Sequence, residues 1–391
     1  MKPAILLEEA ANHIYDFGSQ DASDILAKLN LKHGLAKLIW VLRKHKVDTE
    51  NLFAVTSPDS GITRNKERWQ AGFSYGCLLR WPSKEEAGSA FAFPEIRPNA
   101  CGMLVAKLNE IPSLNELCER LHKIEKEGVE VESERLKLNV GISNHFIELC
   151  KVEESNSPEL KPGDNVAVIH TSPSEFKSWL YDYKSWEAKG GTNEDTPFGP
   201  LLVLQGQLAE EYINAYQQIE RFSYHKRLVL AKHLFKDFEV ISNPTHQGLF
   251  GANEARLGLY SFENQDELLP LTFRWDIHVY LIKPEANITE ELLDKEGLKH
   301  LPPAKKDFLK NLNMLPHGGG YEIPFSPEGW RVMQNGSKRL FANRTQANEF
   351  VFSSPSEIPY YYRGLQIIKD ITRLRLGSVA AKLKQVYTLK Y

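Results

Sequence analysis

The sequence contains few cysteines. Only four occur among 391 residues, at positions 77, 101, 118 and 150, and no two of them form a CxxC pair. This spacing is unlike that of a zinc finger, and it does not suit the disulfide framework of a small secreted domain. We therefore expect all four thiols to be reduced.

Long apolar runs are also missing. No stretch approaches the roughly 18 uninterrupted apolar residues that a membrane-spanning helix requires. The first residues, Met1-Lys2-Pro3, lead into Glu8-Glu9 rather than into an apolar signal core. The composition, 42% hydrophobic and 25% charged, excludes a disordered chain. These features predict a soluble cytoplasmic protein without a membrane partner.

The chain has no large excess of charge of one sign. Its formal net charge of -3 excludes a nucleic-acid binder of the histone kind. Between Tyr360 and Tyr391, however, seven basic residues face one acid, Asp370. The basic residues are Arg363, Lys369, Arg373, Arg375, Lys382, Lys384 and Lys390. They predict a locally positive surface for phosphate, although a solvated basic helix face is the simpler interpretation.

The residue pattern predicts an α+β (mixed α/β) fold in a single large domain, residues 1–391. Residues 1–50 read as a helical segment, with helices over Ala4–Tyr15 and Ala22–Val47, where Leu35, Leu38, Ile39 and Leu42 recur at helical spacing. From Phe53 to Leu108 the chain changes to short apolar runs broken by glycine, proline and polar clusters, which indicates strands joined by long loops. We expect central sheets flanked by helices.

Further elements follow along the chain. Ser113-Leu-Asn-Glu116 is a capping box that predicts a helix to about Lys126. Strands are predicted over Asn165–Ile169, ending on His170, and over Leu201–Leu204, followed by a long helix from about Gln207 to Phe235. Phe238–Ile241 and Trp275–Ile282 also read as strands.

The last third is predicted to hold three features. Residues 284–314 form a possible insertion, with helix over Glu290–Leu312. Alternating apolar and polar residues around Asn335-Gly336 predict a hairpin. A basic helix is expected over about Ser378–Val386.

Histidine is abundant, and several of the 12 histidines lie at strand ends or beside glycine. A neutral imidazole binds manganese, iron or zinc well, and a thiolate can bridge two such ions. Cys101, His145, His170 and His246 are therefore candidate metal ligands, although they are far apart in the sequence. Histidines that are hydrogen-bonded parts of a core are commoner, so the spacing alone leaves a purely structural role open.

The chain resembles the RtcB family of RNA-splicing ligases in patches from about Phe53 onward. Gly141-Ile-Ser-Asn-His-Phe-Ile-Glu148 resembles the family's Gly-x-Gly-Asn-His-Phe-Leu-Glu segment, its most specific motif. Other similar segments follow in the same order and at roughly the same spacing. They are Asn99-Ala-Cys-Gly-Met103, Ile169-His170-Thr-Ser, Thr245-His246-Gln247, Glu357-Ile-Pro-Tyr and Gln385-Val-Tyr-Thr-Leu-Lys390-Tyr391.

This resemblance implies a function and a set of ligands. It implies two manganese ions, with Cys101 bridging them, His145 on one ion, and His170 and His246 on the other. It further implies a histidine that receives GMP from GTP and passes it to an RNA 3′-phosphate (or 2′,3′-cyclic phosphate), so that a 5′-hydroxyl can attack. Asn144 would hold a phosphate of GMP, whereas Glu148 and Lys390 would contact guanine. The implied partners are the ends of tRNA-like or broken RNA.

The sequence departs from the family pattern at several positions. Pro98 replaces an aspartate that serves as a metal ligand in the family, and the adjacent Asn99 offers only an amide, a weaker ligand for a hard cation. The segment Pro58-Asp-Ser-Gly61 lacks the family's histidine, and Ser172-Pro-Ser174 replaces a Gly-Ser-Arg. One metal position and one phosphate contact are therefore altered.

Two registers are possible for the nucleophilic histidine. In the favoured one, His317 in Pro316-His-Gly-Gly-Gly-Tyr321 matches the family's His-Gly-Ala-Gly-Arg, with Tyr321 in place of the arginine. In the other, Ser326–Met333 matches the longer Ser-His-Gly-Ala-Gly-Arg-Val-Met segment, and Pro327 replaces the histidine. A glycine-rich turn can also be only a tight loop, or can hold phosphate without any covalent step.

Three functions remain open from the sequence. The first is an active RNA ligase that uses manganese and GTP. The second is a catalytically impaired relative that binds metal and RNA ends. The third is a metal-dependent phosphoesterase or nucleotidyl transferase acting on another substrate. A monomer is favoured in each case.

Overall fold

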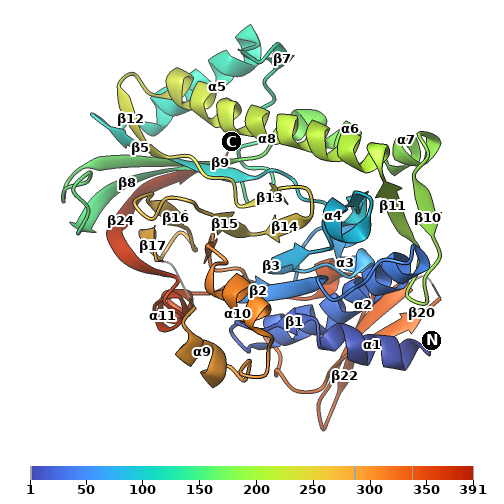
Figure 1. Cartoon of the computed structure of the whole chain (residues 1–391). Coiled ribbons are helices and arrows are strands. Elements are labelled where there is room, and N and C mark those ends of the chain that lie inside the picture. The colour runs from blue at the N-terminus through green and yellow to red at the C-terminus, as the bar shows by residue number, and fades with distance from the viewer. Residues whose placement is uncertain (1, 286–287, 337, 391) are drawn as a thin grey trace.

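The computed structural model describes residues 2–285, 288–336 and 338–390 (Figure 1). Helix makes up 32% and strand 31% of the chain, in several sheets, so the predicted α+β class is confirmed. None of the helices in the described part has the length and apolarity to cross a bilayer.

The largest sheet has seven strands, and every neighbouring pair is antiparallel. In spatial order they are β12 (Phe238–Ser242), β5 (Gly102–Leu108), β9 (Asn165–Thr171), β8 (Phe146–Ser155), β24 (Gly377–Leu389), β17 (Val279–Pro284) and β16 (Leu269–Leu271). Helices α5 (Leu114–Glu127) and α8 (Gln207–Leu234) cover one face (Figure 1). Ala167 and Ile169 of β9 pack into the cluster under these helices, whereas Val166 and Val168 pack on the opposite face. Because side chains alternate along a strand, the sheet is buried on both faces here.

A second sheet has five strands. They are β1 (Ile14–Tyr15), β2 (Phe53–Gly61), β3 (Tyr75–Arg80), β14 (Glu254–Leu257) and β13 (Gln247–Phe250). Helices α1 (Pro3–Ala11) and α2 (Ala22–Lys44) pack on it through a cluster in which Leu35 and Ile39 meet Ala54 and Leu79. The other face belongs to a separate apolar cluster that includes Leu78.

Short elements complete the fold. Two three-stranded sheets have the orders β10 (Thr192–Glu194), β11 (Leu201–Gln205), β4 (Phe91–Ala92) and β20 (Trp330–Asn335), β21 (Lys338–Arg344), β22 (Glu349–Phe352). The two-stranded pairs are β6 (Glu130–Val131) with β7 (Glu134–Arg135), β15 (Leu259–Ser261) with β18 (Met314–Pro316), and β19 (Tyr321–Glu322) with β23 (Tyr361–Tyr362). The remaining α-helices are α3 (Lys66–Ala71), α4 (Lys84–Ala87), α6 (Lys177–Leu180), α7 (Tyr183–Ala188), α9 (Glu290–Lys295), α10 (Pro303–Lys310) and α11 (Gln366–Arg373).

Several predicted elements are confirmed. Helix α5 begins with the expected capping box, in which the Ser113 hydroxyl accepts from the Glu116 amide and the Glu116 carboxylate accepts from the Ser113 amide. The long helix α8 follows β11 as expected. Strands β20 and β21 form the hairpin at Asn335-Gly336, and Ser337 lies outside the described residues.

The predicted helix over Ser378–Val386 is wrong, because these residues lie in strand β24. Alanine, lysine and leucine favour a helix in isolation, but β24 pairs along its length with both β8 and β17. These long-range hydrogen bonds outweigh the local preference.

Other predicted elements differ in extent. The helix predicted over Glu290–Leu312 is interrupted, and its residues form α9 and α10 instead. The helix predicted over Ala4–Tyr15 ends at Ala11, and Ile14-Tyr15 forms β1 instead, paired in parallel with β2. The strand predicted over Trp275–Ile282 begins only at Val279. Trp275 is 81% exposed, so an aromatic residue typical of strands lies here in a solvent-facing loop.

The segment 284–314 contributes to an apolar core. Leu293 of α9 and Leu309 of α10 are fully buried in the cluster that also contains Leu259 and Ile371. Residues 286 and 287 lie outside the described part of the chain.

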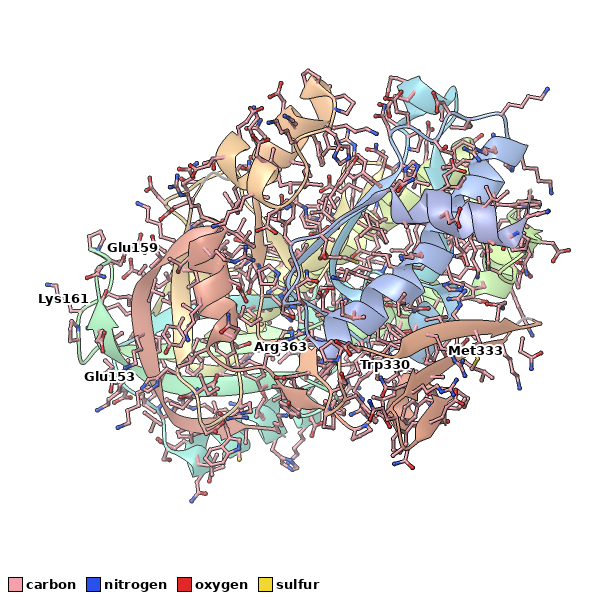
Figure 2. The ribbon with its side chains drawn as sticks, turned by 90° about the horizontal axis from the view of Figure 1, so that it is seen from below. Glu153, Glu159, Lys161, Trp330, Met333 and Arg363 are labelled. Atoms are coloured by element: carbon pink, nitrogen blue, oxygen red, sulfur yellow. The ribbon has the colours of Figure 1, made fainter. Side chains whose placement is uncertain are left out.

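Three of the seven basic residues near the C-terminus are paired with acids. Arg363 is buried and paired with Asp21, and Arg373 pairs with Glu296. Lys382 pairs with Glu153, which Figure 2 shows at the outer end of the seven-stranded sheet, well away from Arg363. Arg363, Arg373 and Lys382 therefore add little unpaired positive charge to this end of the chain, because acids from other elements neutralise them.

Candidate metal centre and active site

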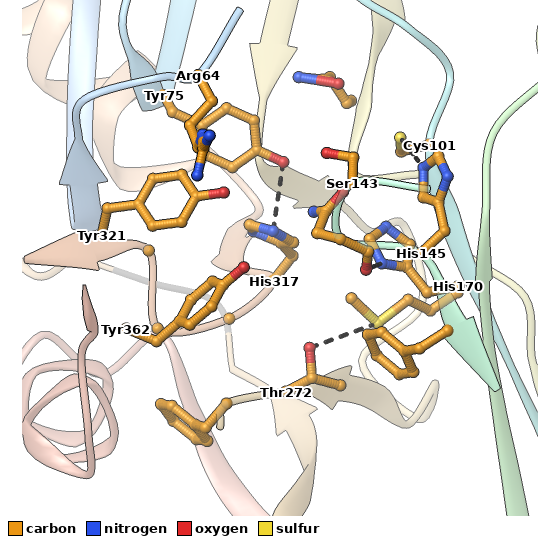
Figure 3. A pocket seen from close by; sticks show the side chains of 18 of the residues that line it. Arg64, Tyr75, Cys101, Ser143, His145, His170, Thr272, His317, Tyr321 and Tyr362 are labelled. Carbon is orange, nitrogen blue, oxygen red and sulfur yellow. Dashed lines mark hydrogen bonds between the residues drawn. The ribbon is translucent and has the colours of Figure 1, made fainter. Parts of the chain in front are cut away.

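A cavity of about 1140 Å³ is lined by residues from both large sheets. Figure 3 shows its interior, with His317 between a group of tyrosines and a group formed by Cys101, His145 and His170. All of the candidate residues identified in the sequence except His246 line this cavity, namely Cys101, Asn144, His145, Glu148, His170, His317 and Lys390. His246 lies directly behind it, stacked on His317 with ring centroids 4.4 Å apart.

Backbone pairing brings Cys101, His170 and His246 together. Cys101 immediately precedes β5, and the next residues of β5 pair with β9 so that Met103 lies opposite His170. The loop before β13 adds to the edge of the same sheet, because the amide of His246 donates to the carbonyl of Cys101 at 3.0 Å. Three distant segments therefore meet at one point.

These three side chains form a group able to hold a metal ion. Their donor atoms all lie within 4.8 Å of one another, and all three residues are buried. Nε2 of His170 and both ring nitrogens of His246 have no hydrogen-bond partner among the described residues. Buried polar atoms are nearly always satisfied, so unpartnered imidazole nitrogens beside a thiol fit a metal ion well.

The electrostatic surroundings favour neutral imidazoles. Burial, together with the neighbouring histidines, holds the pKa of His170 and of His246 well below the usual value. The Nδ1 of His170 donates a hydrogen bond to the backbone carbonyl of Asn144 at 2.9 Å. Nε2 is therefore unprotonated in the neutral ring, and its lone pair is free to bind a metal. A neutral imidazole with its other nitrogen held in this way is the form that binds a metal.

His145 lies beside the thiol but outside this three-residue group. Its Nε2 is 3.4 Å from Sγ of Cys101, and its ring centroid is 5.1 Å from that of His170. Burial lowers the pKa of His145 to about 3, and the charge of Lys177 adds to this effect. His145, which was predicted to be a metal ligand, therefore lies at the site and contacts one of the three clustered residues, Cys101.

The loops that carry Cys101 and His145 hold strained backbone. Ala100 and Ser143 both have positive φ, 52° and 62°, although neither is glycine. Helix α8 fixes the first loop, since the Tyr216 hydroxyl accepts from the amide of Ala100 and the Ser223 hydroxyl donates to its carbonyl. Strain of this kind persists only where neighbouring contacts enforce it, and it is common at functional sites.

His317 presents one nitrogen to the cavity. Its Nδ1 lies 2.8 Å from the carbonyl oxygen of Gly258 and 3.1 Å from Oδ2 of Asp59. Both partners are acceptors, so Nδ1 carries the proton and Nε2 keeps a lone pair. The hydroxyl of Tyr75 lies 3.3 Å from Nε2 (Figure 3). Imidazole in this tautomer is suited to act as a nucleophile or base through Nε2.

Asp59 and Tyr75 are site residues that were not predicted from the sequence. Asp59 is fully buried on β2, and the Ser57 hydroxyl donates to its other oxygen at 2.5 Å. In its segment, Pro58-Asp-Ser-Gly61, the aspartate itself is the useful signal, although the family's histidine is missing. Tyr75 begins β3 in a run of apolar residues and carries no recognisable signal in the sequence.

The residues expected to contact a nucleotide lie along one edge of the cavity. Strands β8 and β24 pair so that Thr388 is opposite Glu148, which places Lys390 at the same end of the sheet. The Thr388 hydroxyl donates to Oε1 of Glu148 at 2.6 Å. Burial raises the pKa of Glu148 above its usual value. Asn144 lines the cavity from the loop before β8. Tyr391, which follows Lys390 in the C-terminal motif, lies outside the described residues.

Cations dominate the rest of the lining. Glu148 is the one acid among the described lining residues, against six basic residues, which are Arg64, Arg68, Arg97, Lys177, Arg274 and Lys390. Arg97 and Arg274 pair with Glu67 and Asp276. Arg68 is fully buried and bonds instead to the carbonyls of Ile96 and Arg97. A cavity lined in this way attracts anions.

The positions that depart from the family pattern also have clear locations. Asn99 accepts from the amide of Cys101 through Oδ1 at 3.3 Å, so its side chain braces the loop. No carboxylate joins the three-residue group within the described part of the chain. In the rival register for the nucleophile, Pro327 and its neighbours 326–333 contribute nothing to the cavity lining, unlike His317.

No model of a known protein family matches this sequence, and no curated protein matches it.

Proposed function

We propose that this protein is a metal- and GTP-dependent RNA ligase of the RtcB type, which joins RNA 3′-phosphate and 5′-hydroxyl ends through a histidine–GMP intermediate. The arrangement of His317 is the observation that carries the proposal. Its Nδ1 is held by Asp59 and Gly258, and its Nε2 faces a cation-lined cavity next to a Cys-His-His cluster. A nucleophilic histidine, a metal site and cationic side chains are the groups expected for nucleotidyl transfer.

In the first step, Nε2 of His317 attacks the α-phosphorus of GTP. A nitrogen–phosphorus bond forms, the bond to the bridging oxygen breaks, and pyrophosphate leaves. The Asp59 carboxylate stabilises the positive charge that develops on the imidazole, because it accepts from Nδ1. GMP then passes to the RNA 3′-phosphate, and a 5′-hydroxyl attacks the activated phosphorus with release of GMP.

Manganese is the metal that the family resemblance implies, and Cys101, His170 and His246 would hold it. When bound, the ion supplies positive charge that neutralises the phosphoryl oxygens during transfer. Asn144 would hold the phosphate of GMP, and Glu148 with Lys390 would contact guanine, since all three line the cavity.

Labelling with GTP tests this proposal. Incubation with GTP labelled at the α-phosphate and with manganese is expected to leave an acid-labile, alkali-stable label on the protein, whereas ATP labelled in the same way leaves much less. If the protein stays unlabelled but still binds RNA ends in a salt-sensitive way, it is not a ligase. A catalytically impaired protein that binds metal and RNA ends would then be indicated.

A second candidate is a catalytically impaired relative that binds metal and RNA ends. The Tyr75 hydroxyl favours it, because it lies at hydrogen-bond distance from the nitrogen that must attack. Burial raises the pKa of Tyr75 well above its usual value, so the hydroxyl stays protonated and donates to Nε2. Attack requires this hydrogen bond to break. Release of phosphate from simple esters without GTP would instead indicate a phosphoesterase.

Replacing Cys101 by alanine is expected to weaken metal binding by more than about 100-fold, because even outer partners of metal ligands contribute about 10- to 100-fold. Titration with manganese or zinc, followed by calorimetry, measures the change. The added metal should raise the melting temperature of the wild type but not of the variant. Cys150→Ala, at another buried thiol, serves as the matched control and should bind metal normally.

GTP affinity is expected to fall as the pH is lowered. Glu148 accepts guanine N–H groups only as a carboxylate, and burial raises its pKa, so protonation removes the acceptor at a higher pH than in an exposed glutamate. Glu148→Gln should weaken GTP binding by roughly 10- to 100-fold and should abolish this pH dependence. Calorimetric titrations with GTP across the acidic range measure both effects. An unchanged pH profile in the variant would remove Glu148 from the nucleotide site.

A further inference from the structure

The donor atoms at this centre suffice for one metal ion. Cys101, His170 and His246 are the only three His, Cys, Asp or Glu residues of the described chain whose donor atoms gather within 4.8 Å. With solvent or a substrate oxygen in the fourth position, they match the three-ligand pattern of a catalytic ion. The remaining candidate, His145, touches only the thiol within this group at hydrogen-bond distance.

A second ion between Cys101 and His145 would lack ligands. It would have one shared thiolate and one imidazole, with no carboxylate from the described residues to complete its coordination. The side chain of Asn99 is engaged with the Cys101 amide. A catalytic ion ordinarily has three protein ligands, whereas this position offers only two, one of which is shared with the first ion. This side of the thiol therefore has no adequate set of donors.

The cavity also carries an exposed ammonium group. Lys177 begins α6 and lines the cavity. Burial raises the pKa of the Cys101 thiol to about 11, and the ammonium of Lys177 is the strongest of the charges that oppose this rise. Lys177 is also the charge that acts most strongly on His145. Within the described chain, no acid pairs with Lys177, so its charge is available to the cavity.

We propose that the centre takes one divalent metal ion, on Cys101, His170 and His246, and that the exposed ammonium of Lys177, which lines the same cavity, supplies the positive charge that a second ion would otherwise bring. This inference rests on the metal centre of the proposed function. A lysine ammonium is a compact charge with three N–H donors, and it binds phosphoryl oxygens as a point charge. The ligand for Lys177 is therefore a phosphate oxygen of the nucleotide or of the RNA end.

Metal counting tests the first half of the inference. The full chain is loaded separately with Mn²⁺ and with Zn²⁺, freed of unbound metal, and examined by elemental analysis against protein concentration. We expect one ion per chain in the wild type and in His145→Gln, and none in His170→Ala. Two ions in the wild type would overturn the inference and leave the proposed metal centre intact. No ion in the wild type would remove the proposed centre itself.

Phosphate binding tests the second half. Inorganic phosphate is titrated into metal-loaded wild type, Lys177→Gln and Lys161→Gln. Lys161 is the matched control, since Figure 2 shows it at the outer end of the seven-stranded sheet. Lys177→Gln should bind phosphate about tenfold more weakly with its metal count unchanged, whereas Lys161→Gln should bind as the wild type does. Equal phosphate affinity in all three proteins would overturn the role of Lys177.

Discussion

Replacing His317 by alanine is expected to abolish the covalent label that the proposed function predicts for the wild-type protein after incubation with GTP. The phosphoramidate requires a nitrogen lone pair aimed at the cavity, and Nε2 of His317 provides it because Nδ1 is engaged by Gly258 and Asp59. Loss of a nucleophile that works together with other catalytic residues lowers the rate of the catalysed reaction by about 10⁶-fold. The measurement is retention of label after denaturation and gel separation.

Two comparisons make this result specific. His300→Ala, at an exposed histidine next to α10, should label as the wild type does. Thermal unfolding of His317→Ala shows whether the variant stays folded, which matters because the side chain is buried. A folded His317→Ala protein that still accepts GMP would remove His317 from the mechanism.

Asp59→Asn is expected to slow formation of the adduct by about 10⁴-fold, the size of the effect when a buried aspartate beside a catalytic histidine is replaced by asparagine. The carbonyl of Gly258 would still accept from Nδ1, but the negative charge beside the ring would be lost. The positive charge that develops on the imidazole during attack would then lack its carboxylate partner. Single-turnover labelling with GTP measures the rate.

Asp24→Asn is the matched control for this variant. Asp24 is as deeply buried as Asp59, but it pairs with Lys28 on α2 and does not contact His317. Burial raises the pKa of Asp24 to about 6, so its amide replacement should fold and should label at the wild-type rate. If Asp59→Asn and Asp24→Asn label equally fast, Asp59 is a structural residue only.

The sequence predicted the members of the site better than their arrangement. Cys101, His170 and His246 were chosen as residue types, and backbone pairing between β5, β9 and the loop before β13 brings them together. That pairing joins segments far apart along the chain, so no local pattern reveals it. The same limit applies to His145, whose position beside the thiol follows from the start of β8.

Asp59 and Lys177 were harder to predict from the sequence than the candidate metal ligands. Asp59 gains its role only because β2 brings it beside the loop after β18. Lys177 lies on a short helix whose sequence, Lys-Ser-Trp-Leu, has no distinctive spacing. Ser172-Pro-Ser174 lacks the arginine of the family pattern, whereas Lys177, three residues further along the chain, lines the cavity.

The fold was predictable where local signals are strong. The capping box at Ser113 and the turn at Asn335-Gly336 fix their elements through contacts between near neighbours in the chain. Strand β24 was missed because its alanines and lysines favour a helix, and only pairing with β8 and β17 decides otherwise. Contacts between distant segments, which a single sequence does not display, account for that error.

The central claim, that Cys101, His170 and His246 hold a metal ion next to His317, is tested most directly by diffraction from crystals grown with zinc or manganese, recorded at the absorption edge of the metal. We expect one anomalous peak about 2.3 Å from Sγ of Cys101 and about 2.0–2.1 Å from a ring nitrogen of His170 and of His246, distances typical of zinc. Metal-loaded crystals without a peak at this position, and with the three side chains in hydrogen bonds to protein or water, would contradict the claim.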